Sequence, residues 1–412
     1  KFFTTEKRKF IVLDAPGHEE YTRNMVTGAS SAQLAIILVD ARKGIMTQTR
    51  RHSFICNILG IKNILLAVNK MDLVDYEKNT YNKIVNDYKD FANKIGIQNF
   101  TSIPISGLKG DNINTYSKNT KWYKGLFLLD YLEKIEVGKV RDSFENFYMP
   151  VQWINRPNQD FRGFSGKIAS GKIKPGNKVV ILPSKKTSYV DRIVSYDGDL
   201  DQAISNQSIT LTLKDEVSCS RGQIIASTNS SIKTSDQFEA IIIWMDETTM
   251  IPGRSYYLKV GTETVSAFIS DLKYKVNVNT MEKIASKTLE INDIGIANIT
   301  TDQSIPFMPY NENHTLGGFI LIDKLTNLTV GAGLINFALR RANNIQWQNT
   351  DITRDKRAIL KNQKPAIIWM TGLSGSGKST IANRLEKKLF KLNLHTFILD
   401  GDNVRKGLNH DL

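Results

Sequence analysis

The stretch that decides the fold of the carboxy-terminal part of this chain has the pattern G-x-x-x-x-G-K-S. It consists of Gly372, Leu373, Ser374, Gly375, Ser376, Gly377, Lys378 and Ser379. In such a loop the glycines let successive backbone N–H groups point at phosphate oxygens, and the lysine neutralises phosphate charge. We expect a buried strand at residues 366–371 and a helix at residues 380–389, whose N-terminus favours an anion. The stretch therefore predicts a nucleotide-phosphate site in which the Ser379 hydroxyl ligates Mg²⁺.

The amino-terminal region alternates short apolar strands with amphipathic helices, which is typical of a parallel sheet covered by helices. The expected strands are residues 9–13, 34–40, 63–69 and 100–105, and residues 80–95 have helical spacing. Three loops that follow these strands carry the candidate site residues. They are Asp14, Ala15, Pro16, Gly17, His18, Asn69, Lys70, Met71, Asp72, Ser106, Gly107 and Leu108. We expect these loops to form a second nucleotide site.

The chemistry of these loops favours guanine. The Asp72 carboxylate can accept bonds from the ring N–H and the exocyclic amine of guanine, a donor pair that adenine lacks. Asn69 can brace the loop, and the Lys70 stem can pack over the face of the base. The 106–108 loop would complete the pocket with backbone groups. At the other end, Asp14 can hold Mg²⁺ through water and Gly17 can bring its N–H to a γ-phosphate.

Together the three loops resemble the signature motifs of a translation-factor-type GTPase. The resemblance implies that GTP binds here and that His18 orients the attacking water, since a neutral imidazole has both a donor and an acceptor. A purely structural loop histidine is the alternative. The phosphate loop of this domain is expected upstream of Lys1. We therefore expect the chain to be a piece of a longer protein, truncated at both ends, that by itself binds GTP weakly or not at all.

The middle of the chain has a different pattern, with short strands separated by turns and no helical spacing, which is typical of barrels or sandwiches. Gly166, Gly171 and Gly176 recur at equal intervals, and we expect each to supply a positive φ angle. The stretch is long enough for two antiparallel β-barrels. The expected divisions are 1–146 for the α/β GTPase domain, 147–236 and 237–341 for the barrels, 342–363 for a linker, and 364–412 for the start of a second α/β domain.

Several longer stretches narrow the resemblance. Residues 22–30, 40–44, 48–53 and 151–163 look like the large subunit of bacterial sulfate adenylyltransferase, and the similarity runs from residue 1 to about 340. In that family a GTPase domain and two barrels form a regulatory subunit. A separate small subunit joins ATP and sulfate into adenylyl sulfate and pyrophosphate, an uphill reaction that is coupled to GTP hydrolysis. The sequence departs mildly from the family at Gly107 and Ala15, where alanine and threonine are common.

Residues 369–380 and 399–405 resemble adenylyl-sulfate kinase, which transfers the γ-phosphate of ATP to the 3′-hydroxyl of adenylyl sulfate. The resemblance implies that Asp402 acts on the ribose hydroxyl as the catalytic residue and that Asp402 and Arg405 contact adenylyl sulfate. Asp400 would assist near Mg²⁺, although helix capping is another reading of the two aspartates. Only the first part of a kinase is covered, so we expect no kinase turnover from this chain alone.

Composition restricts the classes of partner and the cellular location that we expect for this protein. The net charge is +14, but the lysines are scattered, so we expect neither a nucleic-acid partner nor a membrane partner. Cys56 and Cys219 are far apart and are expected to be reduced core residues, which with the lack of a signal peptide favours the cytoplasm. The expected partners are the small catalytic subunit, ATP, sulfate and adenylyl sulfate, with GTP and Mg²⁺. The alternative function, an elongation factor that delivers tRNA, does not explain the second P-loop.

Overall fold

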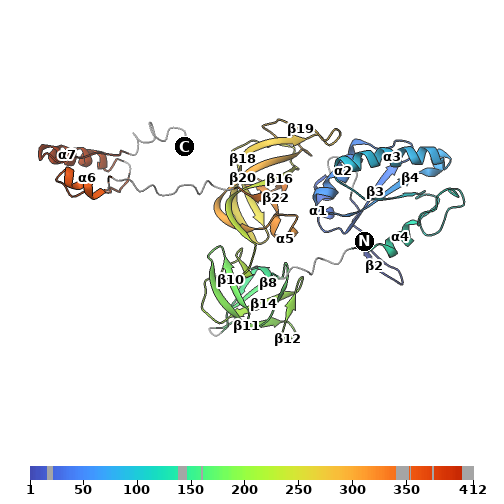
Figure 1. The fold of residues 1–412 in the computed structure, drawn as a ribbon, viewed down its shortest axis with the longest axis horizontal. Helices are drawn as coiled ribbons and strands as arrows, with labels where there is room; N and C mark the ends of the chain where they lie inside the picture. Colours follow the sequence, from blue (N-terminus) through green and yellow to red (C-terminus); the bar gives the residue numbers. More distant parts are fainter. Residues whose placement is uncertain are drawn as a thin grey trace. The chain divides into compact units, whose positions relative to one another are not determined.

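The structure is a computed structural model that describes residues 1–15, 22–137, 146–158, 161–339, 352, 354–373 and 375–400. Six of the predicted site residues lie outside these ranges: Pro16, Gly17, His18, Ser374, Asp402 and Arg405. The chain divides into two compact units, Lys1–Arg341 and Ala342–Leu412, each described here by itself (Figure 1).

The first unit begins with an α/β domain built on a three-stranded parallel sheet in the order β3-β4-β5. These strands are β3 (Leu34–Asp40), β4 (Asn63–Asn69) and β5 (Thr101–Pro104). The helical elements are α1 (Thr22–Ala29), α2 (Thr47–Ile58), η2 (Met71–Val74), α3 (Lys78–Lys94) and α4 (Leu128–Lys134). Strand β4 is a continuous apolar run because it is covered on both faces, with Leu66 and Val68 facing one core cluster and Leu65 and Ala67 another.

The strand expected at residues 9–13 is shorter than predicted. The structure has β2 at Lys9–Ile11, paired antiparallel with β1 (Phe2–Thr4) in a separate two-stranded sheet. Val12 and Leu13 are exposed. The helix expected at residues 80–95 is confirmed as α3, whose buried side chains include Tyr81, Ile84 and Tyr88 on one face.

The next part of the unit is the first β-barrel. Its path runs β6-β15-β10-β11-β14-β8-β7, with β12 paired to β11 and a separate β13-β9 ladder. The strands are β6 (Tyr148–Pro150), β7 (Trp153–Asn155), β8 (Gly163–Lys167), β9 (Lys172–Ile173), β10 (Lys178–Leu182), β11 (Lys186–Ser195), β12 (Gly198–Asp199), β13 (Ala203–Ile204), β14 (Ser208–Leu213) and β15 (Ile224–Ser227). The interior holds Phe164, Ile181 and Leu211, all buried.

The second barrel closes completely. Its path runs β17-β21-β22-β16-β20-β18, and β18 pairs again with β17. The elements are β16 (Lys233–Trp244), β17 (Ser255–Val260), β18 (Glu263–Val276), β19 (Lys283–Ile284), β20 (Ile294–Phe307), α5 (His314–Gly317), β21 (Gly318–Asp323) and β22 (Thr329–Ala338). Closure removes the exposed sheet edges that would otherwise invite pairing with other chains. Figure 1 shows this barrel in yellow and orange.

Two sequence expectations for the barrels need correction. Gly171 and Gly176 have positive φ angles of 75° and 83°, as predicted, but Gly166 does not. Gly166 lies in β8, where an added Cβ would stand 2.3 Å from the Pro150 carbonyl oxygen, so close backbone approach requires the glycine there. The expected division between residues 236 and 237 falls inside β16, because polar Lys233 already pairs with Phe307.

The second unit differs most from expectation. Within the predicted linker the structure has a helix, α6 (Arg354–Leu360). Helix α7 (Lys378–Lys391) is confirmed and is longer than predicted. Residues 366–371, predicted as a buried strand, are irregular, and Ile367 and Trp369 are exposed. A strand needs a hydrogen-bonded neighbour, and among the described residues of this unit no paired strand is present.

Candidate nucleotide sites

The first candidate site lies where β4 and β5 end side by side. The Asn69 side-chain oxygen Oδ1 accepts two backbone hydrogen bonds, from Lys70 N at 2.7 Å and from Gly107 N at 2.9 Å. A further backbone bond joins Met71 N to Ile105 O at 3.2 Å. The asparagine therefore ties together the two loops that the sequence assigns to base recognition, although they are 38 residues apart.

The remaining residues of these loops divide into buried and exposed positions. Met71 is fully buried, which anchors the loop, while Asp72 is partly exposed in the first turn of η2. Ser106 is fully buried and its Oγ accepts a bond from Lys109 N at 3.1 Å. Leu108 is 84% exposed. Met71 and Ser106 thus anchor the two loops to the sheet, which leaves Asp72 and Leu108 nearer the surface.

Lys70 connects these loops to a third strand end. Its backbone is left-handed, with φ of 63°, and its Nζ lies 3.0 Å from Oδ2 of Asp40, the last residue of β3. The Asp40 carboxylate also accepts Arg42 Nε at 3.0 Å and Arg42 Nη2 at 2.7 Å, a two-pronged pair. Hydrogen bonds from Arg42 and then Lys70 hold the pKa of the Asp40 carboxyl well below its usual range.

Sequence reasoning did not assign Asp40 or Arg42 to a site. The signal was available, because Asp40 ends a strand that the sequence predicts and parallel strands in register end at the same sheet edge. The register indeed pairs Asp40 with Asn69. At the expected phosphate end, Asp14 and Ala15 follow β2 and are exposed.

The second candidate site is the loop before α7. Its described glycines have positive φ angles: 150° at Gly372, 78° at Gly375 and 83° at Gly377. The Lys378 ammonium folds back over the loop, donating to Gly372 O at 2.8 Å and to Leu373 O at 2.6 Å. The described glycines thus have the positive φ angles that a phosphate loop uses, and the lysine lies against the loop carbonyls.

Two oxygen-bearing side chains meet beside this loop. Ser379 Oγ donates to Asp400 Oδ2 at 3.0 Å. A hydroxyl and a carboxylate are oxygen ligands of the kind that Mg²⁺ prefers, so the residues present fit that ion. Among the residues that the structure describes there is no group of three or more His, Cys, Asp or Glu side chains that could hold a metal without other ligands.

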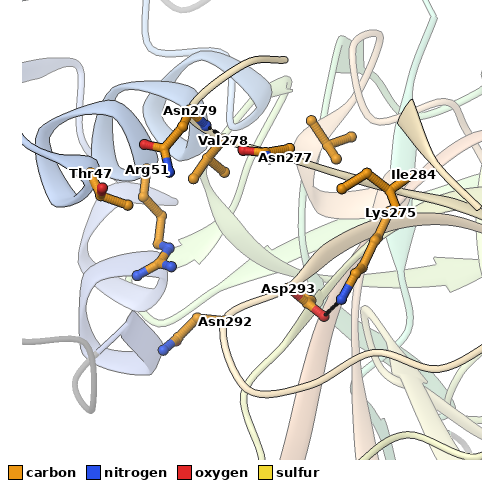
Figure 2. A pocket seen from close by; sticks show the side chains of 10 residues that line it. Thr47, Arg51, Lys275, Asn277, Val278, Asn279, Ile284, Asn292 and Asp293 are labelled. Atoms are coloured by element: carbon orange, nitrogen blue, oxygen red, sulfur yellow. Dashed lines mark hydrogen bonds and ion pairs between the residues drawn. The ribbon is translucent and has the colours of Figure 1, made fainter. Parts of the chain in front are cut away.

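A cavity of about 240 Å³ lies between α2 and the second barrel. Figure 2 shows Thr47 and Arg51 of α2 on one side and Lys275, ion-paired with Asp293 at 2.9 Å, on the other. Nearby, Arg50 Nη1 donates to the Asn279 carbonyl at 3.2 Å. This cavity belongs to the contact between the α/β domain and the second barrel, and it contains none of the residues predicted for nucleotide binding.

The fold and the loops define a translation-factor-type GTPase domain with two β-barrels, followed by the start of a P-loop kinase domain. The family comparisons agree. Residues 1–138 match the Elongation factor Tu GTP binding domain, residues 237–336 match the GTP-eEF1A C-terminal domain-like family, and residues 364–412 match Adenylylsulphate kinase.

Curated relatives narrow the family further. The chain is 48% identical to sulfate adenylyltransferase subunit 1 of Colwellia psychrerythraea, over 82% of this chain and 72% of that protein. It is 53% identical to the bifunctional enzyme NodQ of Rhizobium sp. strain N33 and 50% identical to the bifunctional enzyme CysN/CysC of Xylella fastidiosa, over its whole length in both cases. The chain belongs to the family of sulfate adenylyltransferase subunit 1, in the form joined to an adenylylsulfate kinase.

The chain spans 64% of the length of the NodQ relative and 66% of the length of the CysN/CysC relative.

Both cysteines, Cys56 and Cys219, are free and buried, as predicted, and burial raises the pKa of each thiol to about 12. Among the helices of the described residues, none is long and apolar enough to cross a membrane.

Proposed function

We propose that the full-length protein activates sulfate in two steps. The GTPase domain and barrels serve a sulfate adenylyltransferase that joins ATP and sulfate into adenylyl sulfate and pyrophosphate. The carboxy-terminal kinase domain then phosphorylates adenylyl sulfate at its 3′-hydroxyl with ATP. The observation that carries this proposal is that one chain matches both the Elongation factor Tu GTP binding domain and Adenylylsulphate kinase, and is similar over its whole length to a bifunctional enzyme.

In the first site, Asp72 would recognise guanine, Asn69 would hold its loop against the 106–108 loop, and His18 would orient the attacking water. Asp14 would hold Mg²⁺ and Gly17 would face the γ-phosphate. The supporting geometry is the Asn69 brace between the base loops. We propose GTP as the nucleotide because only guanine pairs both of its donors with a carboxylate at this position.

In the second site, the backbone N–H groups of residues 372–379 would hold the ATP phosphates, with Lys378 neutralising their charge. Ser379 and Asp400 would ligate Mg²⁺, which supplies charge stabilisation of the transferring phosphoryl group when bound. Asp402 would position the ribose hydroxyl and Arg405 would pair with the phosphosulfate. The Ser379–Asp400 contact at 3.0 Å supports the proposed Mg²⁺ role of these two side chains.

We also propose a separate small subunit as the partner that carries the adenylyl-transfer site, and the cytoplasm as the location. The proposed domain divisions are 1–146, 147–232, 233–341 and 364–412, with the second division moved to the start of β16.

The test uses the full-length protein with and without a sulfate adenylyltransferase small subunit. Adenylyl sulfate formation from ATP and sulfate should require both proteins and should rise when GTP is added. Conversion of adenylyl sulfate to its 3′-phosphate should need only ATP and the full-length protein. Tight capture of aminoacyl-tRNA without any sulfate-dependent reaction would instead favour the elongation-factor function.

A further inference from the structure

Lys70 is held at both ends. Its backbone N–H donates to Asn69 Oδ1 at 2.7 Å, and its ammonium lies 3.0 Å from Asp40 Oδ2, on a different strand 30 residues earlier. These two contacts take the Lys70 side chain across the edge where β3 and β4 end. A lysine stem that is fixed at both ends presents a flat apolar surface with few alternative rotamers.

Asp40 is itself fixed more firmly than a usual surface carboxylate. Arg42 binds it through its backbone N–H at 3.0 Å and through both prongs of its guanidinium. The Asp40 side chain is only 17% exposed, whereas those of Lys70 and Arg42 are each 47% exposed. The carbonyl of Asp40 also accepts bonds from Lys43 N and Gly44 N, which closes the turn after β3.

The Lys70 ammonium is therefore half-exposed, whereas the Asp40 carboxylate that it contacts is mostly buried and held rigidly by Arg42. Isolated ion pairs on a protein surface contribute little to stability, so the pair has no strong structural purpose. Holding a ligand-contacting side chain in its bound conformation does raise affinity, because less rotamer freedom is lost on binding.

We propose that Asp40 is a positioning residue for guanine-nucleotide binding, which acts by holding the Lys70 stem flat beneath the base. The inference rests on the proposed GTP site and adds a residue that the recognition loops do not contain. Arg42 supports Asp40 from the solvent side and keeps the carboxylate charged. The turn after β3 is thereby part of the base site, although it is distant from the base loops in sequence.

The test measures binding of a fluorescent GDP analogue to the full-length protein by titration. Asp40→Asn keeps the shape of the side chain and removes its charge, and Lys70→Met keeps the stem and removes the ammonium. Each should weaken binding roughly threefold to fivefold, the range expected for one partly exposed pair. The double variant should be no weaker than Lys70→Met alone, because both changes remove the same interaction.

Two further variants separate positioning from general stability. Asp40→Glu retains the carboxylate and should recover most of the affinity. Asp199→Asn breaks another two-pronged Arg–Asp pair, with Arg192 in the first barrel, and should leave affinity unchanged. Circular dichroism and thermal unfolding show whether each variant is folded, and Lys70→Met tests the same interaction without altering β3.

The outcomes separate this inference from the proposed function. If the wild-type protein binds the guanine nucleotide and Asp40→Asn binds it equally well, Asp40 does not position the site. Additive losses in the double variant would likewise show that Asp40 acts independently of Lys70. If the wild-type protein binds no guanine nucleotide at all, the proposed GTP site and this inference are both wrong.

Discussion

The two candidate nucleotide sites are held in opposite ways. The base site of the GTPase domain depends on bonds between distant residues, with Asn69 joined to Gly107 and Lys70 joined to Asp40. Among the described residues of the second unit, the Lys378 ammonium of the phosphate loop bonds to near neighbours, two, five and six positions before it. One site therefore requires a folded sheet, whereas the other takes its loop shape from a short stretch of chain.

This difference between the two sites explains which of their parts have the structure that the sequence predicts. Glycines permit the loop shape at residues 372–379 without help from a sheet, because their left-handed φ angles carry no Cβ penalty. The described residues around that loop form no strands, because a strand needs a hydrogen-bonded neighbouring strand. In the GTPase domain the partners are present, and three strand ends meet at a single edge.

The largest effect is expected at the locally held site. Lys378→Ala in the full-length protein should lower adenylyl-sulfate kinase turnover by about 10² to 10³-fold, because a charge aimed at the transferring phosphate is lost. GTP hydrolysis should not change. Lys388→Ala, at the other end of α7, serves as the control. Retained kinase activity in Lys378→Ala would show that the loop is not the ATP site.

Removing a core side chain from β4 should destabilise the GTPase domain, whose base site depends on the parallel sheet. Leu66→Ala removes a fully buried side chain from β4 and should cost about 2–5 kcal/mol of the free energy of unfolding. Urea denaturation should show a shift only in the transition of the GTPase domain. Leu360→Ala on α6, where the side chain is 85% exposed, should shift neither the transition of the GTPase domain nor any other unfolding transition. Equal shifts in all transitions would mean that the units unfold together.

Removing the brace should affect ligand binding more than stability. Asn69→Ala leaves two loop N–H groups without their acceptor and should lower GTP affinity roughly tenfold to a hundredfold. Calorimetric titration of the full-length protein with GTP measures the loss. Asn63→Ala, at the opposite end of β4, is a matched control. Unchanged GTP affinity in Asn69→Ala would place base recognition elsewhere.

The smallest effect concerns pH. The pKa of Asp40 is depressed in the folded protein, so its ion pairs are fully present above the unfolded pKa and are lost only as pH falls through the lower folded value. The contribution of Asp40 to guanine affinity should therefore be constant between pH 8 and pH 5. The ratio of wild-type to Asp40→Asn affinity, measured at several pH values, tests this. A ratio that falls towards one already near pH 6 would contradict it.

Much of the fold followed from local patterns. Apolar runs predicted β3 and β4, and the spacing of Tyr81, Ile84 and Tyr88 predicted α3. Sequence reasoning failed where long-range contacts decide the outcome. Gly166 is explained by the approach of Pro150, and the polar start of β16 becomes a strand because Phe307 lies opposite Lys233.

By itself the sequence determined the classes of the two sites, because the base-recognition residues and the glycine-rich loop are contiguous motifs whose chemistry depends on residue type and short spacing. Only the tertiary structure decided that Asp40 and Arg42 stand beside Lys70, because that contact follows from the parallel register of β3 with β4. Register is set by side chains packed on both faces of a sheet, and no short stretch of sequence contains that information.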